Sequence, residues 1–289
     1  LVRGICGYVK DGVIPGYYTY EAGQAGVGDI FDWFVKTCVP AAYAEEAKAR
    51  GISLHKLLRE KAAPRKPGES GLLALDWWNG NRNVLGNSKL SGMILGMTLT
   101  TKPEDIYRAL IEATAYGLRV IAERYESDGV AVGSIVAGGG IAQKDTMMMQ
   151  IYADVLGRPI RIAGTTQAGA LGSAMYASVA GGVYPDIQSA AAHLAKPDIG
   201  TYTPDAESHR IYSGLYAEYK KLYDYFGCEN TVMEQLSGMR QGRFYASEIP
   251  PAGAPPEGGV RLCGAVLLCR SPLYPLCRFA QDDTAETGA

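Results

Sequence analysis

The sequence predicts an α/β fold, and two neighbouring strand–turn–helix units carry this prediction. In the first unit, the apolar residues Ile135–Ala137 predict a buried strand that ends in three glycines, Gly138, Gly139 and Gly140. A helix with apolar residues three and four positions apart follows from Lys144. Because glycine has no Cβ, a ligand can reach the backbone amides of the turn, and such turns commonly cradle anions or adenosine. A purely structural tight turn is the alternative.

The residues before this unit predict a hairpin, two helical regions and one further strand. Glycines and a proline among short apolar pieces indicate a hairpin or edge strands over residues 6–20. An amphipathic helix follows Gly28, and a charged helical stretch covers residues 41–62. Residues 72–76 form a short apolar strand that leads into residues 77–82, WWNGNR. This mixture of aromatic, amide and guanidinium groups lines a pocket, or forms a surface loop whose tryptophan rings pack on the core.

The remaining elements complete the α/β pattern. A long helix with one apolar face begins at Pro103, and it predicts scaffold rather than site. After the glycine turn, residues 160–162 form a second strand, and Thr165 or Thr166 caps a helix of small residues. A last helix, which ends at Gly227, carries a stripe of tyrosines that indicates core packing.

Composition limits the partners of this chain. Its 289 residues have a net charge of -2, which argues against a basic surface that grips nucleic acid or an acidic membrane. No stretch approaches the roughly 20 apolar residues of a membrane span, so we expect a cytoplasmic protein that acts on a small molecule. The six cysteines form no CxxC pair and the three histidines are scattered, so we expect no metal site.

The two ends of the chain differ from its middle. We expect one domain over residues 1–240 and, over residues 241–289, an irregular or disordered tail or an altered reading frame. The composition changes there to runs of proline and glycine, with three of the six cysteines and no helical or alternating period. The chain begins without methionine inside a predicted strand, and we expect that an N-terminal part is absent.

Several segments match a known family. They are YEAGQ followed by GDIFDWF, then WWNGNR, VAGGGIAQKD and QAGALGSAMYASVAGG. On these residues, the chain resembles the C-terminal half of members of the FGGY family of carbohydrate kinases, from about residue 4 to residue 239. The WWNGNR segment resembles the members that act on L-ribulose rather than on xylulose or glycerol, whereas the glycine triplet is common to the family.

This resemblance implies a fold and an activity. It implies an actin-like ATPase (ribonuclease H-like) domain, the second of two domains that close on ATP, Mg²⁺ and a ketopentose. The full-length parent is expected to phosphorylate L-ribulose to L-ribulose 5-phosphate in L-arabinose degradation. The catalytic base and a threonine-rich phosphate turn are expected upstream of Leu1. We therefore assign no catalytic base to this chain and expect it to be inactive alone.

The resemblance also implies site residues, motif by motif. Glu21 in YEAGQ resembles a sugar-contacting acidic residue, and a carboxylate accepts hydrogen bonds from hydroxyls. Gly28, at a helix N-terminus, resembles the glycine that approaches the nucleotide phosphates. The glycine turn of residues 138–140 resembles the adenosine side of the site. Asp145 stands where relatives often have Asn, and it is expected to accept from an adenine amino group. For Gln167, which stands where many relatives have Glu, we expect only a helix cap.

Two alternatives stay open. The first is a kinase for another ketopentose or polyol, which a panel of sugars distinguishes. The second is a non-catalytic nucleotide-binding module that closes on ATP without chemistry. Assembly into a homo-oligomer also stays open.

Overall fold

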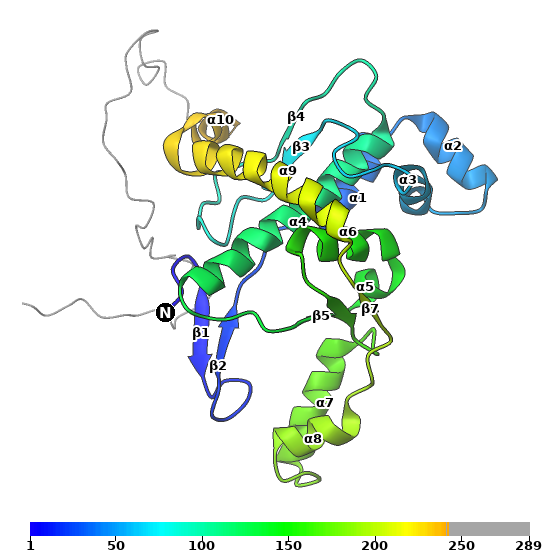
Figure 1. Cartoon of the computed structure of the whole chain (residues 1–289). Coiled ribbons are helices and arrows are strands. Elements are labelled where there is room, and N and C mark those ends of the chain that lie inside the picture. Colours follow the sequence, from blue (N-terminus) through cyan, green and yellow to red (C-terminus); the bar gives the residue numbers. More distant parts are fainter. Residues whose placement is uncertain (241, 243–289) are drawn as a thin grey trace, which may run out of the picture.

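Two long helices cross at the centre of the molecule (Figure 1). The computed structural model describes residues 1–240 and 242, so the predicted irregular tail lies outside the described residues. Helix α4 (Pro103–Ser127) packs against α9 (Ala206–Asp224), and α6 (Thr146–Leu156) packs against both. The predicted tyrosine stripe of α9 is confirmed as core, since every one of its four tyrosines from 212 to 223 is buried. The helix predicted from Pro103 is confirmed as the central scaffold.

Within residues 1–240 and 242, the strands form three separate small sheets. Their mixture with helices confirms the predicted α/β class, and the first sheet confirms the N-terminal hairpin. One sheet is the antiparallel hairpin of the first two strands, and another pairs the next two strands antiparallel. In the third sheet, β6 lies in the middle, parallel to β5 and antiparallel to β7. The strands are β1 (Gly7–Lys10), β2 (Tyr18–Glu21), β3 (Leu73–Leu75), β4 (Met93–Leu95), β5 (Ile135–Ala137), β6 (Ile160–Ile162) and β7 (Gly200–Tyr202).

The helical region after Gly28 contains a break that the sequence analysis missed. Helix α1 (Gly28–Thr37) is present as predicted, but the single charged stretch expected over residues 41–62 is two helices. Gly51 adopts a positive φ of 63° between them, and the Ser53 hydroxyl accepts a hydrogen bond from the Lys56 amide at 3.2 Å. Glycine in the left-handed region ends one helix and the serine cap begins the next. They are α2 (Ala41–Ala49) and α3 (Leu54–Ala62).

The glycine turn differs from the prediction in two respects. A short helix, α5 (Gly140–Lys144), starts within the turn, so the following helix begins at Thr146 rather than at Lys144. The prediction of a buried strand is wrong for Val136, which is 48% exposed. Strand β5 lies at the edge of a three-stranded sheet, so its side chains are only partly covered.

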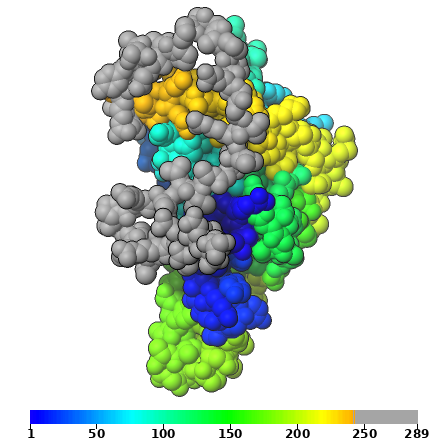
Figure 2. Space-filling view, turned by 90° about the vertical axis from the view of Figure 1, so that its left-hand side faces the viewer, coloured from blue at the N-terminus to red at the C-terminus, as the bar shows by residue number. Residues whose placement is uncertain are grey.

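The last part of the fold corrects the predicted helix cap. Helix α7 (Ala168–Ala180) begins after Gln167, and neither Thr165 nor Thr166 is its N-cap. The Thr165 hydroxyl instead accepts from the Gln167 amide at 3.1 Å, one turn before the helix, and the Gln167 side chain makes no capping bond. Figure 2 shows the blue hairpin against the light green pair of α7 and α8 (Ile187–Leu194). The Tyr176 hydroxyl joins them by donating to the Val13 carbonyl.

The chain of the described part ends in a π-helical turn, Tyr225–Glu229, and helix α10 (Val232–Arg240). Within residues 1–240 and 242, none of the helices combines the length and the apolar character that crossing a membrane requires.

Candidate functional site

Glu21 lies at the end of the hairpin, where the structure brings it to the WWNGNR segment. It is the last residue of β2, and its carboxylate Oε1 accepts from Arg82 Nη2 at 2.9 Å. Both side chains are more than half exposed, so the pair faces solvent rather than the core. An acidic group held by a guanidinium at the surface is oriented yet accessible to a polar ligand.

Gly28 lies at the N-terminus of α1, next to the short helix that follows the glycine turn. A Cβ added to Gly28 would lie 3.5 Å from Ile141 Cδ1, an ordinary contact distance. Ile141 directly follows Gly140, so the structure places the start of α1 beside the glycine turn although 113 residues separate Gly28 from Ile141 in the sequence. The N-terminus of a helix has free amides and a positive end of its dipole, which favour an anion.

The backbone of the glycine turn is open at its tip. Gly139 has a φ of 91°, a conformation that side chains disfavour. A Cβ built on Gly139 or Gly140 would meet no atom within 4 Å, whereas one on Gly138 would contact Ala168 at 3.6 Å. The first glycine therefore packs against the start of α7, and the other two face open space.

Asp145 is buried and already bonded within the protein. The side chain is 6% exposed, and its Oδ1 accepts from the Met148 amide at 3.0 Å, which caps α6. Arg59 Nη1 lies 3.5 Å from Oδ2. Burial raises the pKa of this carboxyl, against the opposing effect of the Met148 amide and of Arg59. The structure thus gives Asp145 a capping role, and its predicted contact with adenine stays a prediction.

Helix α3 contributes two side chains that the sequence analysis did not single out. Arg59 pairs with Asp145, and His55 Nδ1 lies 3.2 Å from the Tyr107 hydroxyl. Burial lowers the pKa of His55, so the imidazole tends toward its neutral form. The available signal was their spacing, since residues four apart lie on one face of a helix.

The WWNGNR segment is largely structural. Trp77 is 1% exposed and its ring meets Tyr223 edge-on at 5.2 Å, which agrees with the alternative in which tryptophan packs on the core. Trp78 packs against Trp33 of α1, with ring centroids 5.5 Å apart. The segment therefore ties α1 and α9 to the loop that carries Arg82.

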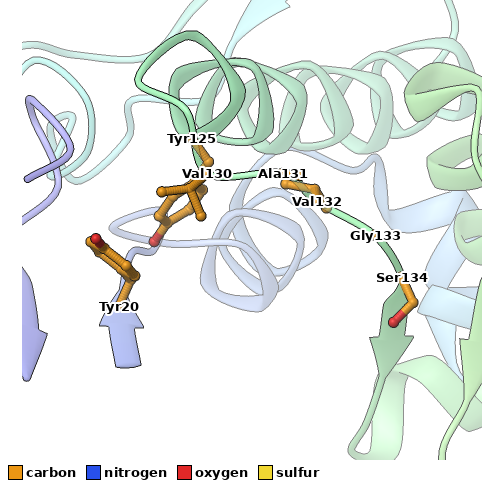
Figure 3. A pocket seen from close by; sticks show the side chains of 7 residues that line it. All are labelled: Tyr20, Tyr125, Val130, Ala131, Val132, Gly133 and Ser134. Atoms are coloured by element: carbon orange, nitrogen blue, oxygen red, sulfur yellow. The ribbon is translucent and has the colours of Figure 1, made fainter. Parts of the chain in front are cut away.

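A shallow hollow of about 720 Å³ separates the hairpin from β5. Figure 3 shows Tyr20 and Tyr125 at one end and Ser134, which directly precedes β5, at the other end. The ring centroids of Tyr20 and Tyr125 lie 5.8 Å apart. Tyr20 is the neighbour of Glu21 in the chain, but no residue of the glycine turn lines the hollow. Among residues 1–240 and 242, no three His, Cys, Asp or Glu side chains gather in a group that could hold a metal ion.

Comparison with known proteins decides the family. The model of the C-terminal domain of the FGGY family of carbohydrate kinases matches residues 2–181. The chain belongs to this family. The FGGY resemblance drawn from the sequence motifs is confirmed, and with it the actin-like ATPase fold.

Relatives of the FGGY chain carry the name ribulokinase. The chain is 51% identical to the ribulokinase of Bacillus licheniformis over 258 residues, which cover 88% of the chain and 47% of the relative. It is 52% identical to the ribulokinase of Halalkalibacterium halodurans, covering 83% of this chain and 43% of the relative. Among solved structures, the xylulose kinase of Rhodospirillum rubrum aligns with a TM-score of 0.60 and 28% identity, covering 72% and 40% of the two chains. The chain spans about half the length of the curated relatives it matches.

Proposed function

We propose that this chain is the C-terminal domain of a cytoplasmic kinase that phosphorylates L-ribulose to L-ribulose 5-phosphate in L-arabinose degradation, with ATP as donor. One observation carries the proposal. Identity to proteins named ribulokinase is 51% over 88% of the chain, whereas the structurally similar xylulose kinase shares 28%. Residues 1–240 form the domain in this proposal.

On the nucleotide side, we assign the phosphates to the start of α1 and the adenosine to the glycine turn. Gly28 leaves the amides at the helix N-terminus uncovered, and the positive end of the helix dipole attracts the anion. Gly139 and Gly140 offer a backbone surface with no side chain above it. Asp145 lies between α5 and α6 and caps α6.

In this proposal, Mg²⁺ is bound by the phosphate oxygens of ATP. The described residues contain no cluster of acidic side chains that fits a divalent cation, so we place no magnesium ligand on this domain. Mg²⁺ is commonly held by phosphate oxygens and water with one or two carboxylates, and it neutralises charge on the transferring group.

On the sugar side, we assign Glu21 to hydroxyl groups of the ketopentose. A carboxylate accepts hydrogen bonds from two hydroxyls, and Arg82 holds this carboxylate by donating to Oε1. The terminal hydroxyl attacks the γ-phosphorus, the bond from this phosphorus to the β–γ bridging oxygen breaks, and ADP leaves with that oxygen. The proton of the hydroxyl passes to a base that we do not assign to this chain. Positioning of the two substrates supplies most of the rate increase in such a transfer.

Nucleotide binding tests the phosphate assignment on the purified chain. Gly28→Ala adds a methyl group that the fold accepts, since its Cβ would lie 3.5 Å from Ile141. We expect at least about tenfold weaker ATP binding by calorimetry, because the methyl group covers the helix N-terminus. Gly214→Ala on α9 is the control, because its Cβ meets no atom within 4 Å and lies outside the proposed site. Equal affinities for both variants would refute the assignment.

Activity tests the reaction. We would fuse this chain to the part of the Bacillus licheniformis ribulokinase that it does not span, and assay ATP-dependent phosphorylation of L-ribulose, D-ribulose, xylulose and glycerol. The proposal requires L-ribulose to be the best substrate and Glu21→Gln to raise KM for the sugar without changing ATP affinity. Preference for another sugar would favour the kinase with a different substrate. ATP binding without phosphorylation of any sugar would favour the non-catalytic module.

A further inference from the structure

The connection between β2 and α1, residues 22–27, joins the two proposed ligand contacts. Glu21 stands at its start and Gly28 at its end. The connection has no regular secondary structure, so its backbone polar groups need partners from elsewhere in the chain. Its geometry therefore depends on whatever supplies those partners.

Two of these backbone groups have partners in one segment, residues 76–83, which we call the clamp segment. The Gly23 amide donates to Asn83 Oδ1 at 3.0 Å, and Asn79 Nδ2 donates to the Ala25 carbonyl at 3.1 Å. Arg82 extends the series by one residue through its bond to Glu21. The clamp segment thus contacts the connection on both sides of Gln24.

The side chain of Gln24 is partly buried and bonds to groups of the interior. Its Nε2 donates to Asp76 Oδ2 at 2.7 Å and to the Thr114 carbonyl at 2.8 Å. Asp76 is 6% exposed, and its other oxygen accepts from the Tyr219 hydroxyl at 3.1 Å. A buried carboxylate that receives two side-chain donors holds the amide in one orientation.

Gly117 of α4 has no side chain, and this leaves room for the Gln24–Asp76 pair. A Cβ at Gly117 would lie 2.5 Å from Gln24 Nε2 and 2.7 Å from Asp76 Oδ2, closer than side-chain carbons approach other atoms. Glycine inside a helix is unfavourable relative to alanine. Helix α4 therefore carries a residue of low helix propensity at the point where the Gln24–Asp76 pair lies against it.

We propose that the clamp segment positions the β2–α1 connection, so that Asp76, Asn79 and Asn83 set the relative placement of the sugar contact Glu21 and the phosphate contact Gly28. The inference rests on the proposed function for the identity of those two ligands. These three residues act through the connection, and we place none of them in contact with a substrate.

The test uses two variants of the clamp segment and a matched control from the same loop. Asn79→Ala removes the exposed bond to Ala25, and Asn83→Ala removes the bond to Gly23. Asn87→Ala is the control, because Asn87 Nδ2 donates to Glu234 at 2.7 Å and its side chain makes no bond to the connection. Asn79 is exposed, so its variant folds even if the variant of the buried Asn83 does not.

Two measurements on the full 289-residue chain decide the outcome. Hydrogen exchange of peptides covering residues 22–28 should become about five- to tenfold faster in Asn79→Ala and in Asn83→Ala, while peptides of α4 keep their protection. ATP affinity should fall by a similar factor, with an unchanged melting temperature for Asn79→Ala. The control should change neither measurement.

Unchanged exchange at residues 22–28 in both variants, or an equal change in Asn87→Ala, would overturn the inference. Faster exchange with unchanged ATP affinity would also overturn it, because the segment would then be only structural. If the unaltered chain does not bind ATP, the proposed function fails. The exchange data would then still decide whether the clamp segment holds the connection.

Discussion

Replacing Asp76 with asparagine should change how the stability of the chain depends on pH. Asp76 is buried, and burial raises the pKa of its carboxyl from 3.8 to about 6, against the hydrogen bonds from Gln24 and Tyr219. Asparagine has nearly the same shape and can present its oxygen to Gln24 and its amide to the Tyr219 hydroxyl. The substitution therefore removes the charge, while Gln24 and Tyr219 keep a hydrogen-bond partner.

The direction in which the free energy of unfolding changes with pH follows from proton binding by Asp76. The folded state, with the raised pKa, binds the Asp76 proton more tightly than the unfolded state, so ionisation of Asp76 lowers stability as pH rises from about 4 to about 6. The shift of roughly 2 units corresponds to about 3 kcal/mol at neutral pH. The free energy of unfolding of Asp76→Asn relative to the unaltered chain should therefore increase with pH, by about 2 kcal/mol between about pH 4.5 and about pH 7.5.

Urea denaturation followed by circular dichroism at several pH values measures this difference. Other carboxylates titrate alike in both chains, so their contributions cancel. Asp186→Asn is a control of opposite sign. Its exposed carboxylate caps α8 through the Ser189 amide, and that bond lowers the pKa of Asp186. The stability lost in that variant should be largest above the ordinary Asp pKa and should vanish in acid. A difference for Asp76→Asn that is constant, or that falls with rising pH, would refute the reasoning.

Three further substitutions test a buried ion pair, a close contact of α4 and the left-handed glycine that ends α6. Arg108→Met leaves the Glu112 carboxylate, 3% exposed, without the Nε donor that lies 2.8 Å away, so urea denaturation should show a loss of about 3–5 kcal/mol. A loss below about 1 kcal/mol would contradict a structural role for this buried pair. Gly117→Ala should lower the melting temperature despite better helix propensity, because its methyl group would lie 2.7 Å from Asp76 Oδ2; a rise would show that α4 can move. Gly157→Ala places alanine at a φ of 63° after α6, and thermal unfolding should show a loss of about 1–3 kcal/mol.

The elements that could be predicted from the sequence are those with a long and regular pattern of apolar or aromatic residues. Helix α4 was predictable from Pro103 and one apolar stripe, and the tyrosines of α9 repeat at helical spacing. The break between α2 and α3 was missed because charged residues are compatible with helix on both sides of Gly51. The exposure of Val136 was missed for another reason. Burial depends on how many strands flank β5, and a single strand does not encode this number.

The candidate site was predictable only in part. The glycine turn was predictable from a strand, three glycines and a helix in succession, and Gly28 was proposed from the family resemblance alone. Contacts between distant segments were not predictable, because nothing local specifies that Arg82 meets Glu21 across 61 residues. Arg59 and its pairing with Asp145 were missed for the same reason, since α3 and the start of α6 meet only in the folded chain.

Under the proposed function, these long-range contacts would let a partly buried segment influence substrate preference. In the resemblance drawn from the sequence, WWNGNR is the segment expected to be typical of kinases of L-ribulose, yet Trp77 and Asn81 are buried. Its exposed groups, Asn79 and Arg82, bond to the connection and to Glu21 rather than standing free. If residues 76–83 set the orientation of Glu21, a change of their sequence alters which sugar hydroxyls that carboxylate can reach. Sugar preference would then be inherited through the support of a contact residue, with the contact residue itself unchanged.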